Sequence, residues 1–246
     1  MDTKFWGPSG WILLHMIAYK YPNKPTKNQK ETHKKFFESL QETLPCYYCR
    51  QSLQKFYQQL PIDEYLNSKE LLTEWIYLIH NKVNNKLRKQ KLLNTQNPSK
   101  EEVDTRFKKL MSEECPMAGW KFIYAIAFNY PRNSKGISNY KKEAYHTFFN
   151  SLGKVAPCSE FKKYYNLAIE KSPINICLQN RTKLTKWLYN INCRVNKNLK
   201  KKDFHKTCRY YNKFRVKSCK KTCRLKNKNT SKKLSQKLSQ KTNKTK

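Results

Sequence analysis

Glycine, acidic residues and long apolar runs are all scarce in this sequence. Only 5 of its 246 residues are glycine. Hairpin turns depend on glycine, so the shortage favours helices over a hairpin-rich sheet. Asp and Glu number 17 against 52 Lys and Arg, a formal net charge of +35. Such an excess predicts attraction to polyanions, whether nucleic acid, anionic lipid or acidic protein.

The longest apolar stretch runs from Trp11 to Tyr19 and is interrupted by His15. It is too short and too polar to span a bilayer, so we expect no membrane span. Met1 is followed at once by sequence typical of a folded domain, so we expect no signal peptide. Nine cysteines without such a signal point to redox chemistry or metal binding rather than to structural disulfides.

Cys46-Tyr-Tyr-Cys49 is a vicinal dithiol preceded by Pro45, a residue that suits the first turn of a helix. In that first turn, both sulfurs would lie near free backbone N–H groups and the positive end of the helix dipole. These features stabilise a thiolate and lower its pKa. The spacing leaves open which cysteine would face a cofactor and which a substrate.

Two helical stretches flank the dithiol and carry aromatic, imidazole and amide side chains one helical turn apart. Trp11, His15 and Tyr19 are spaced i, i+4, i+8, so they share one stripe. His80 and Asn84 are spaced i, i+4 in the same way. Flat aromatic surface, hydrogen-bonding groups and a redox-capable cysteine pair are what a disulfide-exchanging flavin site needs.

Taken together, the three stretches resemble the FAD-linked sulfhydryl oxidases of the Erv/ALR type. They read Trp11-Ile-Leu-Leu-His15-Met-Ile-Ala18-Tyr-Lys-Tyr21-Pro22, Leu44-Pro45-Cys46-Tyr-Tyr-Cys49, and His80-Asn81-Lys-Val83-Asn84-Asn-Lys-Leu87. The resemblance implies a thiol oxidase that forms disulfides in proteins. Electrons would pass from substrate thiols through a Cys46–Cys49 disulfide to FAD and on to oxygen, releasing hydrogen peroxide.

The resemblance also implies which residues line the FAD, and it implies no metal site. These residues are Trp11, His15, Tyr19, Trp75, His80, Asn81, Val83, Asn84 and Leu87, with Lys89 near a phosphate, a role for which Lys86 and Arg88 compete. Oxidases of this type in large cytoplasmic DNA viruses act where host disulfide machinery is absent. By resemblance, this chain fits a viral protein of the host cytoplasm or the virion.

Residues 1–110 are expected to form a five-helix bundle, the FAD-binding oxidase domain. Helix starts are predicted at Pro8-Ser9, Thr26, Pro45 and Ser68, followed by a capping box from Ser99 to Glu102 before a short last helix. No segment alternates as a strand would, so we predict an all-α fold.

The chain then repeats itself. Trp120–Pro131 matches Trp11–Pro22 at an offset of 109, and Thr185–Leu199 matches Thr73–Leu87 at an offset of 112, with 7 of 15 positions identical. Residues 111–119 form the expected joint, and 120–204 a degenerate second copy of the bundle. Because relatives form two-fold dimers, the resemblance suggests that this copy stands in for a partner subunit. A duplicated solenoid without such packing is the alternative.

The substitutions in the second copy fall on the positions that carry the chemistry. His15 becomes Tyr124, Cys49 becomes Phe161, His80 becomes Asn192 and Asn81 becomes Cys193, while Trp120 and Trp187 are kept. Packing residues are retained and the dithiol is lost. We therefore predict a helical bundle without activity.

Residues 205–246 are expected to form a basic, largely disordered tail. From residue 200 onward the chain holds 19 Lys and Arg against a single acid. Contact with nucleic acid or another polyanion competes with a merely solvated tail. Cys219 and Cys223 are a candidate shuttle pair, whereas His205, Cys208, Cys219 and Cys223 together are a candidate zinc site, and the two cysteines could serve neither purpose.

Three other functions compete with the oxidase. A plain helical bundle would use the same tryptophans and histidines for packing alone. A non-enzymatic nucleic-acid-binding protein would rely on the basic surface and hold zinc with its cysteines. An inactive scaffold would keep the oxidase fold without its turnover.

Overall fold

The computed structural model describes residues 3–112, 119–133 and 135–199. Within these ranges the chain is helical and contains no strand, which confirms the all-α prediction. The first copy comprises α1 (Thr3–Tyr19), α2 (Lys27–Thr43), α3 (Tyr47–Gln59), the short η1 (Ile62–Tyr65), α4 (Lys69–Lys89) and α5 (Lys100–Ser112). The second comprises α6 (Trp120–Asn129), α7 (Asn139–Val155), α8 (Ser159–Lys171), the short η2 (Asn175–Cys177) and α9 (Arg181–Asn198).

Most of the predicted capping residues form capping hydrogen bonds at helix starts. Thr26 and Ser68 each cap a helix by accepting a backbone N–H bond three residues on. At the start of α5, the Glu102 backbone N–H donates to Ser99 Oγ at 3.1 Å, and the Ser99 backbone N–H donates to Glu102 Oε2 at 2.7 Å. This reciprocal pair is the predicted capping box.

The prediction for the first helix was wrong at its start. α1 begins at Thr3 instead of Pro8-Ser9, so Pro8 lies inside the helix. A proline there removes one backbone hydrogen bond and argues against continuing the helix. Tertiary packing outweighs that cost, because the early turn buries Trp6 against Phe122 of the second copy, with ring centroids 5.7 Å apart.

The two copies form equivalent hydrogen bonds at corresponding positions, as well as corresponding helices. Tyr21 Oη donates to the Leu66 carbonyl at 2.9 Å, and its counterpart Tyr130 Oη donates to the Leu178 carbonyl at 2.7 Å. Both tyrosines are almost fully buried. In each copy this tyrosine therefore links the end of the first helix to the segment that precedes α4 or α9.

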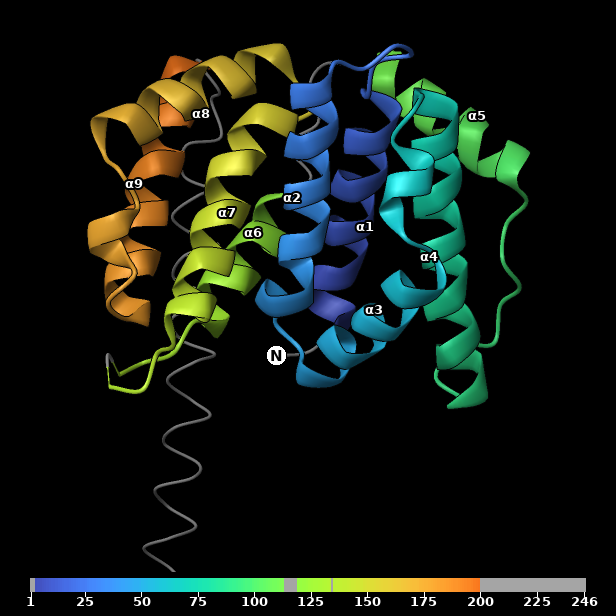
Figure 1. The fold of residues 1–246 in the computed structure, drawn as a ribbon, viewed down its shortest axis with the longest axis horizontal. Coiled ribbons are helices and arrows are strands. Elements are labelled where there is room, and N and C mark those ends of the chain that lie inside the picture. The colour runs from blue at the N-terminus through green and yellow to red at the C-terminus, as the bar shows by residue number, and fades with distance from the viewer. Residues whose placement is uncertain (1–2, 113–118, 134, 200–246) are drawn as a thin grey trace, which may run out of the picture.

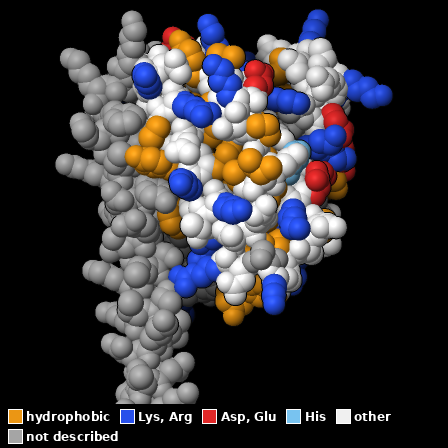
Figure 2. All heavy atoms as spheres, turned by 90° about the vertical axis from the view of Figure 1, so that its left-hand side faces the viewer, with side chains coloured by type: hydrophobic (Ala, Val, Ile, Leu, Met, Phe, Trp, Pro, Cys, Tyr) orange, Lys and Arg blue, Asp and Glu red, His pale blue; other side chains and the backbone are white. Residues whose placement is uncertain are grey.

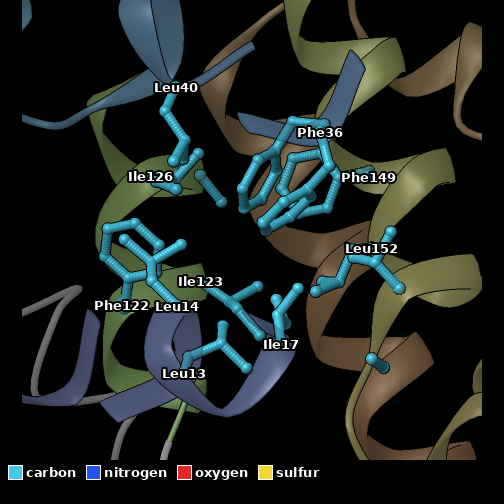
Figure 3. Close-up of a cluster of buried hydrophobic side chains, with 14 of the residues drawn as sticks. Leu13, Leu14, Ile17, Phe36, Leu40, Phe122, Ile123, Ile126, Phe149 and Leu152 are labelled. Atoms are coloured by element: carbon cyan, nitrogen blue, oxygen red, sulfur yellow. The ribbon is translucent and has the colours of Figure 1, made fainter. Parts of the chain in front are cut away.

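The copies lie side by side through their first two helices. α2 packs along α7, and α1 packs against α6, while α4 and α5 lie at one end of the molecule and α8 and α9 at the other (Figure 1). One buried apolar cluster runs across the contact. Figure 3 shows it drawn from four helices, with Leu13, Leu14, Ile17, Phe36 and Leu40 from α1 and α2 facing Phe122, Ile123, Ile126, Phe149 and Leu152 from α6 and α7.

Contacts across this junction are reciprocal. A Cβ added to Gly10 would lie 2.9 Å from the Phe122 ring, and one added to the equivalent Gly119 would lie 2.8 Å from Leu13, the counterpart of Phe122. Only glycine permits such close approach at both places. Residue i of one copy thus meets residue j of the other and j meets i, the pattern of a two-fold interface.

Along the described segments, no helix is both long enough and apolar enough to cross a bilayer.

Candidate active site

A cavity of about 780 Å³ opens in the first copy between α1, α4 and α5, at the amino-terminal end of α3. Its wall is predominantly apolar, with a few polar side chains, the composition typical of small-molecule sites. Seven of the predicted cofactor-binding residues line it, namely Trp11, His15, His80, Asn81, Val83, Asn84 and Leu87. The i, i+4 stripes of the sequence therefore converge on one space.

Two histidines 65 residues apart in sequence meet at the wall. His15 Nε2 lies 3.1 Å from His80 Nδ1, and the His80 ring stacks on Trp11 with centroids 3.8 Å apart and planes 10° apart. On its other side His15 stacks on Phe107 of α5, with a centroid distance of 4.6 Å. Flat rings thus line this part of the cavity.

Both histidines are neutral at physiological pH. Burial, reinforced by His80, lowers the pKa of His15 to about 3. Burial also lowers the pKa of His80 to about 4, with a smaller contribution from the positive charge of Arg106. In a neutral pair one ring nitrogen donates to the other, so the remaining nitrogens can bind a ligand.

Two buried polar atoms at the cavity wall have no hydrogen-bond partner within the described residues. They are His15 Nδ1 and Trp6 Nε1. Buried polar atoms are satisfied in most folded proteins, so each exception needs an explanation. A bound group with polar edges, lying in the cavity, would supply the missing partners.

Cys46 and Cys49 form a disulfide at the start of α3. Cys46 is the N-cap residue, and its Sγ accepts the backbone N–H of Cys49 at 3.2 Å. Cys49 lines the cavity with Ser52 and Leu53, whereas Cys46 is not part of the wall. The two sulfurs are therefore inequivalent, one next to the cavity and one outside it.

Three of the predicted cofactor residues do not line the cavity. Trp75 is fully buried and donates from Nε1 to the Leu60 carbonyl at 3.0 Å. Tyr19 donates from its hydroxyl to Asp104, and Lys89 is exposed at the end of α4. Their roles stay predictions.

Sequence reasoning missed two cations at the wall, Lys4 and Arg106, and left Lys86 unresolved. Arg106 of α5 lines the cavity, as does Lys86, the rival of Lys89. A signal for Arg106 was present, because Val103, Arg106 and Phe107 are spaced i, i+3, i+4 and so share a helix face. That α5 folds back over α1 could not be read from its own sequence.

The corresponding space in the second copy is filled. Tyr124 Oη, at the position of His15, accepts a hydrogen bond from Asn192 Nδ2 at 3.1 Å, and Asn196 Nδ2 donates to Asn192 Oδ1 at 2.7 Å. All three side chains are buried. A hollow beside Cys158 and Phe161 measures about 20 Å³, far too small for a ring system.

Comparison with known proteins places this geometry in a family. The sequence profile of the Erv1/Alr family matches residues 8–108 and again residues 117–224. The chain belongs to the Erv1/Alr family. The first Erv1/Alr match contains the disulfide and most of the residues that line the cavity. The second contains the copy whose interior is filled.

Individual Erv1/Alr relatives match part of the chain. The mitochondrial FAD-linked sulfhydryl oxidase ERV1 of Saccharomyces cerevisiae is 38% identical over 90 residues, which cover 37% of this chain and 47% of that protein. A probable FAD-linked sulfhydryl oxidase of Acanthamoeba polyphaga mimivirus is 39% identical over 85 residues, 34% of this chain and 59% of that one. The chain thus spans about half the length of these two relatives.

Two further similarities also cover only part of the chain. The FAD-linked sulfhydryl oxidase of African swine fever virus (isolate Warthog) is 32% identical over 85 residues, which cover 35% of this chain and 70% of that protein. The crystal structure of the yeast Erv1 core is similar with 31% identity and a TM-score of 0.39, covering 44% of this chain and 85% of that one.

The candidate shuttle Cys219 and Cys223, and the candidate zinc ligands His205 and Cys208, lie outside the described residues. Across the ranges that the structure describes, no group of three or more His, Cys, Asp or Glu side chains could hold a metal ion.

Proposed function

We propose that the chain is an FAD-dependent thiol oxidase that forms disulfides in proteins. The observation that carries this proposal is the position of Cys49, which shares the wall of a large cavity with Trp11, His15 and His80. The cavity volume of about 780 Å³ lies within the range of roughly 300–1,000 Å³ for small-molecule sites. The names of the relatives as FAD-linked sulfhydryl oxidases support the same cofactor and activity.

The residues present fit FAD. Flat rings of Trp11, His15 and His80 offer stacking surfaces, and the unpartnered His15 Nδ1 and Trp6 Nε1 offer hydrogen bonds to polar ring edges. Arg106 supplies positive charge at the wall for the phosphates. We assign the phosphate role to Arg106 in preference to Lys89, because Lys89 is exposed and does not line the cavity.

The two inequivalent sulfurs have different roles in the reaction, Cys46 toward the substrate and Cys49 toward the cavity. A substrate thiolate attacks Cys46 Sγ, forming a mixed disulfide and breaking the Cys46–Cys49 bond, so that Cys49 leaves as a thiolate at the cavity. A second substrate thiolate then attacks the substrate sulfur, releasing oxidised substrate and the Cys46 thiolate. The start of α3 favours both thiolates through its free N–H groups. FAD held beside Cys49 would supply the acceptor for the electron pair of this dithiol, with oxygen as the final oxidant and hydrogen peroxide as its product.

Purified protein tests the proposal against its rivals. A flavin spectrum together with oxygen consumption on adding a small dithiol is the expected result. A colourless preparation with stoichiometric zinc would indicate the nucleic-acid-binding alternative. Bound flavin without oxygen consumption would indicate an inactive scaffold.

The second copy serves, in this proposal, as an internal partner subunit. Phe36 stacks on its own counterpart Phe148 at 5.5 Å, and the contacts of Gly10 and Gly119 are reciprocal, as expected at a two-fold axis. In a solenoid, the second copy would instead stack on one end of the first. We expect one flavin per chain and a monomer in sedimentation. A stable dimer with two flavins per chain would contradict this.

The tail proposals concern residues 205–246. A shuttle at Cys219 and Cys223 predicts that deleting these residues spares oxidation of a small dithiol and slows oxidation of protein thiols. Unchanged rates on protein thiols would remove the shuttle. Zinc bound by the full chain and lost on deletion would favour the zinc site.

A second candidate function is polyanion binding, and the described surface favours it. Figure 2 shows Lys and Arg side chains spread over the end of the molecule formed by α8 and α9, with few acidic ones among them. The exposed cations of these helices are Lys163, Lys171, Lys183, Lys186, Arg194 and Lys197. Binding to DNA should weaken steeply with salt and show no preference for sequence. Affinity that is independent of salt would contradict it.

We also propose that the protein is viral and acts in the host cytoplasm or the virion. The relatives from mimivirus and African swine fever virus support this setting. Detection of the chain in purified virions or in cytoplasmic fractions of infected cells tests it, and its recovery only from a secretory compartment would contradict it.

A further inference from the structure

The outer side of the disulfide is unusually aromatic for a solvent-facing surface. Tyr47 and Tyr48, the two residues between the cysteines, are 59% and 72% exposed. Their rings meet edge to face with centroids 5.5 Å apart. Tyrosine is enriched where proteins bind one another, because it buries a large area with little loss of side-chain freedom. The pair stands next to Cys46, the sulfur on which the proposed reaction begins.

The same surface carries positive charge that forms no ion pair with an acidic side chain of the described residues. Arg50 lies one helical turn after Cys46 and on the same helix face, with its guanidinium 5.8 Å from the Tyr47 ring centre. Lys86 reaches over from α4, with Nζ 2.6 Å from Ser52 Oγ and 3.5 Å from the Tyr48 carbonyl.

Neither cation forms an ion pair within the described chain. Arg50 donates to the Leu44 carbonyl at 2.7 Å, and the partners of Lys86 are likewise neutral oxygens. α3 itself contains no Asp or Glu over its 13 residues. An approaching segment therefore meets two aromatic rings and two uncompensated cations around the reactive sulfur.

We propose that Tyr47, Tyr48, Arg50 and Lys86 form a docking surface for an acidic, cysteine-bearing segment of the substrate protein. This inference rests on the proposed thiol oxidase activity and names its substrate class. Carboxylates flanking the substrate cysteine pair with Arg50 and Lys86, and apolar side chains of the segment cover the tyrosine rings. The docked segment presents its thiolate to Cys46 Sγ, and its attack there displaces the Cys49 thiolate.

The test compares two synthetic peptides on the full chain. Both carry the same cysteine pair, flanked by Asp and Glu in one and by Lys in the other, and dithiothreitol serves as a small neutral substrate. We expect kcat/KM for the acidic peptide to exceed that for the basic one by about tenfold at low salt, with a smaller gap at high salt. Equal values, with dithiothreitol oxidised normally, would overturn the docking surface and leave the oxidase intact. Failure to oxidise dithiothreitol would overturn both.

Matched variants separate this surface from the general positive charge of the chain. Arg50→Gln should lower kcat/KM for the acidic peptide about threefold to fivefold, whereas Lys55→Gln, which removes an exposed charge further along α3, should not. Tyr48→Ser should lower it likewise, whereas Tyr140→Ser, at a 70% exposed position on α7, should not. Dithiothreitol turnover and bound flavin report that each variant is folded. Equal losses in a variant and its control would overturn the proposal.

Discussion

Two buried histidines, His15 and His33, and the half-buried His80 make the stability of this fold depend steeply on pH. His15 and His80 meet at the cavity, and His33 of α2 is held by its Nδ1 contact to the Gln29 carbonyl at 2.8 Å. Burial lowers the pKa of His15 to about 3 and those of His33 and His80 to about 4. In the unfolded chain each would titrate near the ordinary histidine value of about 6.5.

At pH values between the folded-state pKa values and the unfolded-state value of about 6.5, the histidines of the unfolded chain bind more protons than those of the folded chain. The histidine contribution to stability is therefore complete above about pH 6.5 and is lost as the pH falls toward the folded-state values. Lowering the pH from 7 to 5 costs about 2 kcal/mol for each of these histidines, or about 6 kcal/mol for the three. Since whole domains are stable by about 5–15 kcal/mol, the loss should be large at pH 5.

Urea unfolding at pH 7 and pH 5, at matched ionic strength, measures this difference. His33→Gln should reduce the dependence on pH by about one third, because one of three equal contributions is removed. A free energy of unfolding that is equal at both pH values would refute the account of three neutral rings.

Three further predictions concern the site and the junction. Cys49→Ala should abolish oxygen consumption while flavin stays bound, and normal turnover would refute the assigned dithiol. Arg106→Gln should weaken flavin binding about tenfold, since one charge-assisted hydrogen bond is lost; equal affinity in a fluorescence titration would exclude Arg106 as a ligand. Phe148→Ala should lower the free energy of unfolding by about 3–5 kcal/mol, because it empties the centre of the junction. Two separate unfolding transitions in the unaltered protein would contradict the shared core.

The sequence was sufficient to predict the parts of the fold that local chemistry decides. Capping residues such as Thr26 and Ser68 mark helix starts, and the repeat offsets of 109 and 112 revealed the second copy. The start of α1 was predicted wrongly, because Pro8 argues locally for a boundary that the burial of Trp6 overrides. Such long-range packing is invisible in a window of sequence.

In the site, too, features set by local sequence were predicted and features set by long-range packing were not. Helical spacing predicted that His15 and His80 belong to stripes, and the structure brings those stripes within hydrogen-bonding distance. Helical spacing could not show which of Cys46 and Cys49 faces the cavity, because that depends on the direction from which α3 approaches it. Arg106 was missed for a related reason, since its contribution depends on how α5 packs back against α1.

The most direct test of the account is an anaerobic addition of dithiol to the purified protein, followed by its visible absorbance. We predict that the bound flavin loses its absorbance at a rate matching turnover in the unaltered chain. In Cys49→Ser the flavin should stay oxidised, because the disulfide beside the cavity is missing. A protein that holds no flavin, or bleaching that is equally fast without Cys49, would contradict the claim that this disulfide delivers electrons to the cavity.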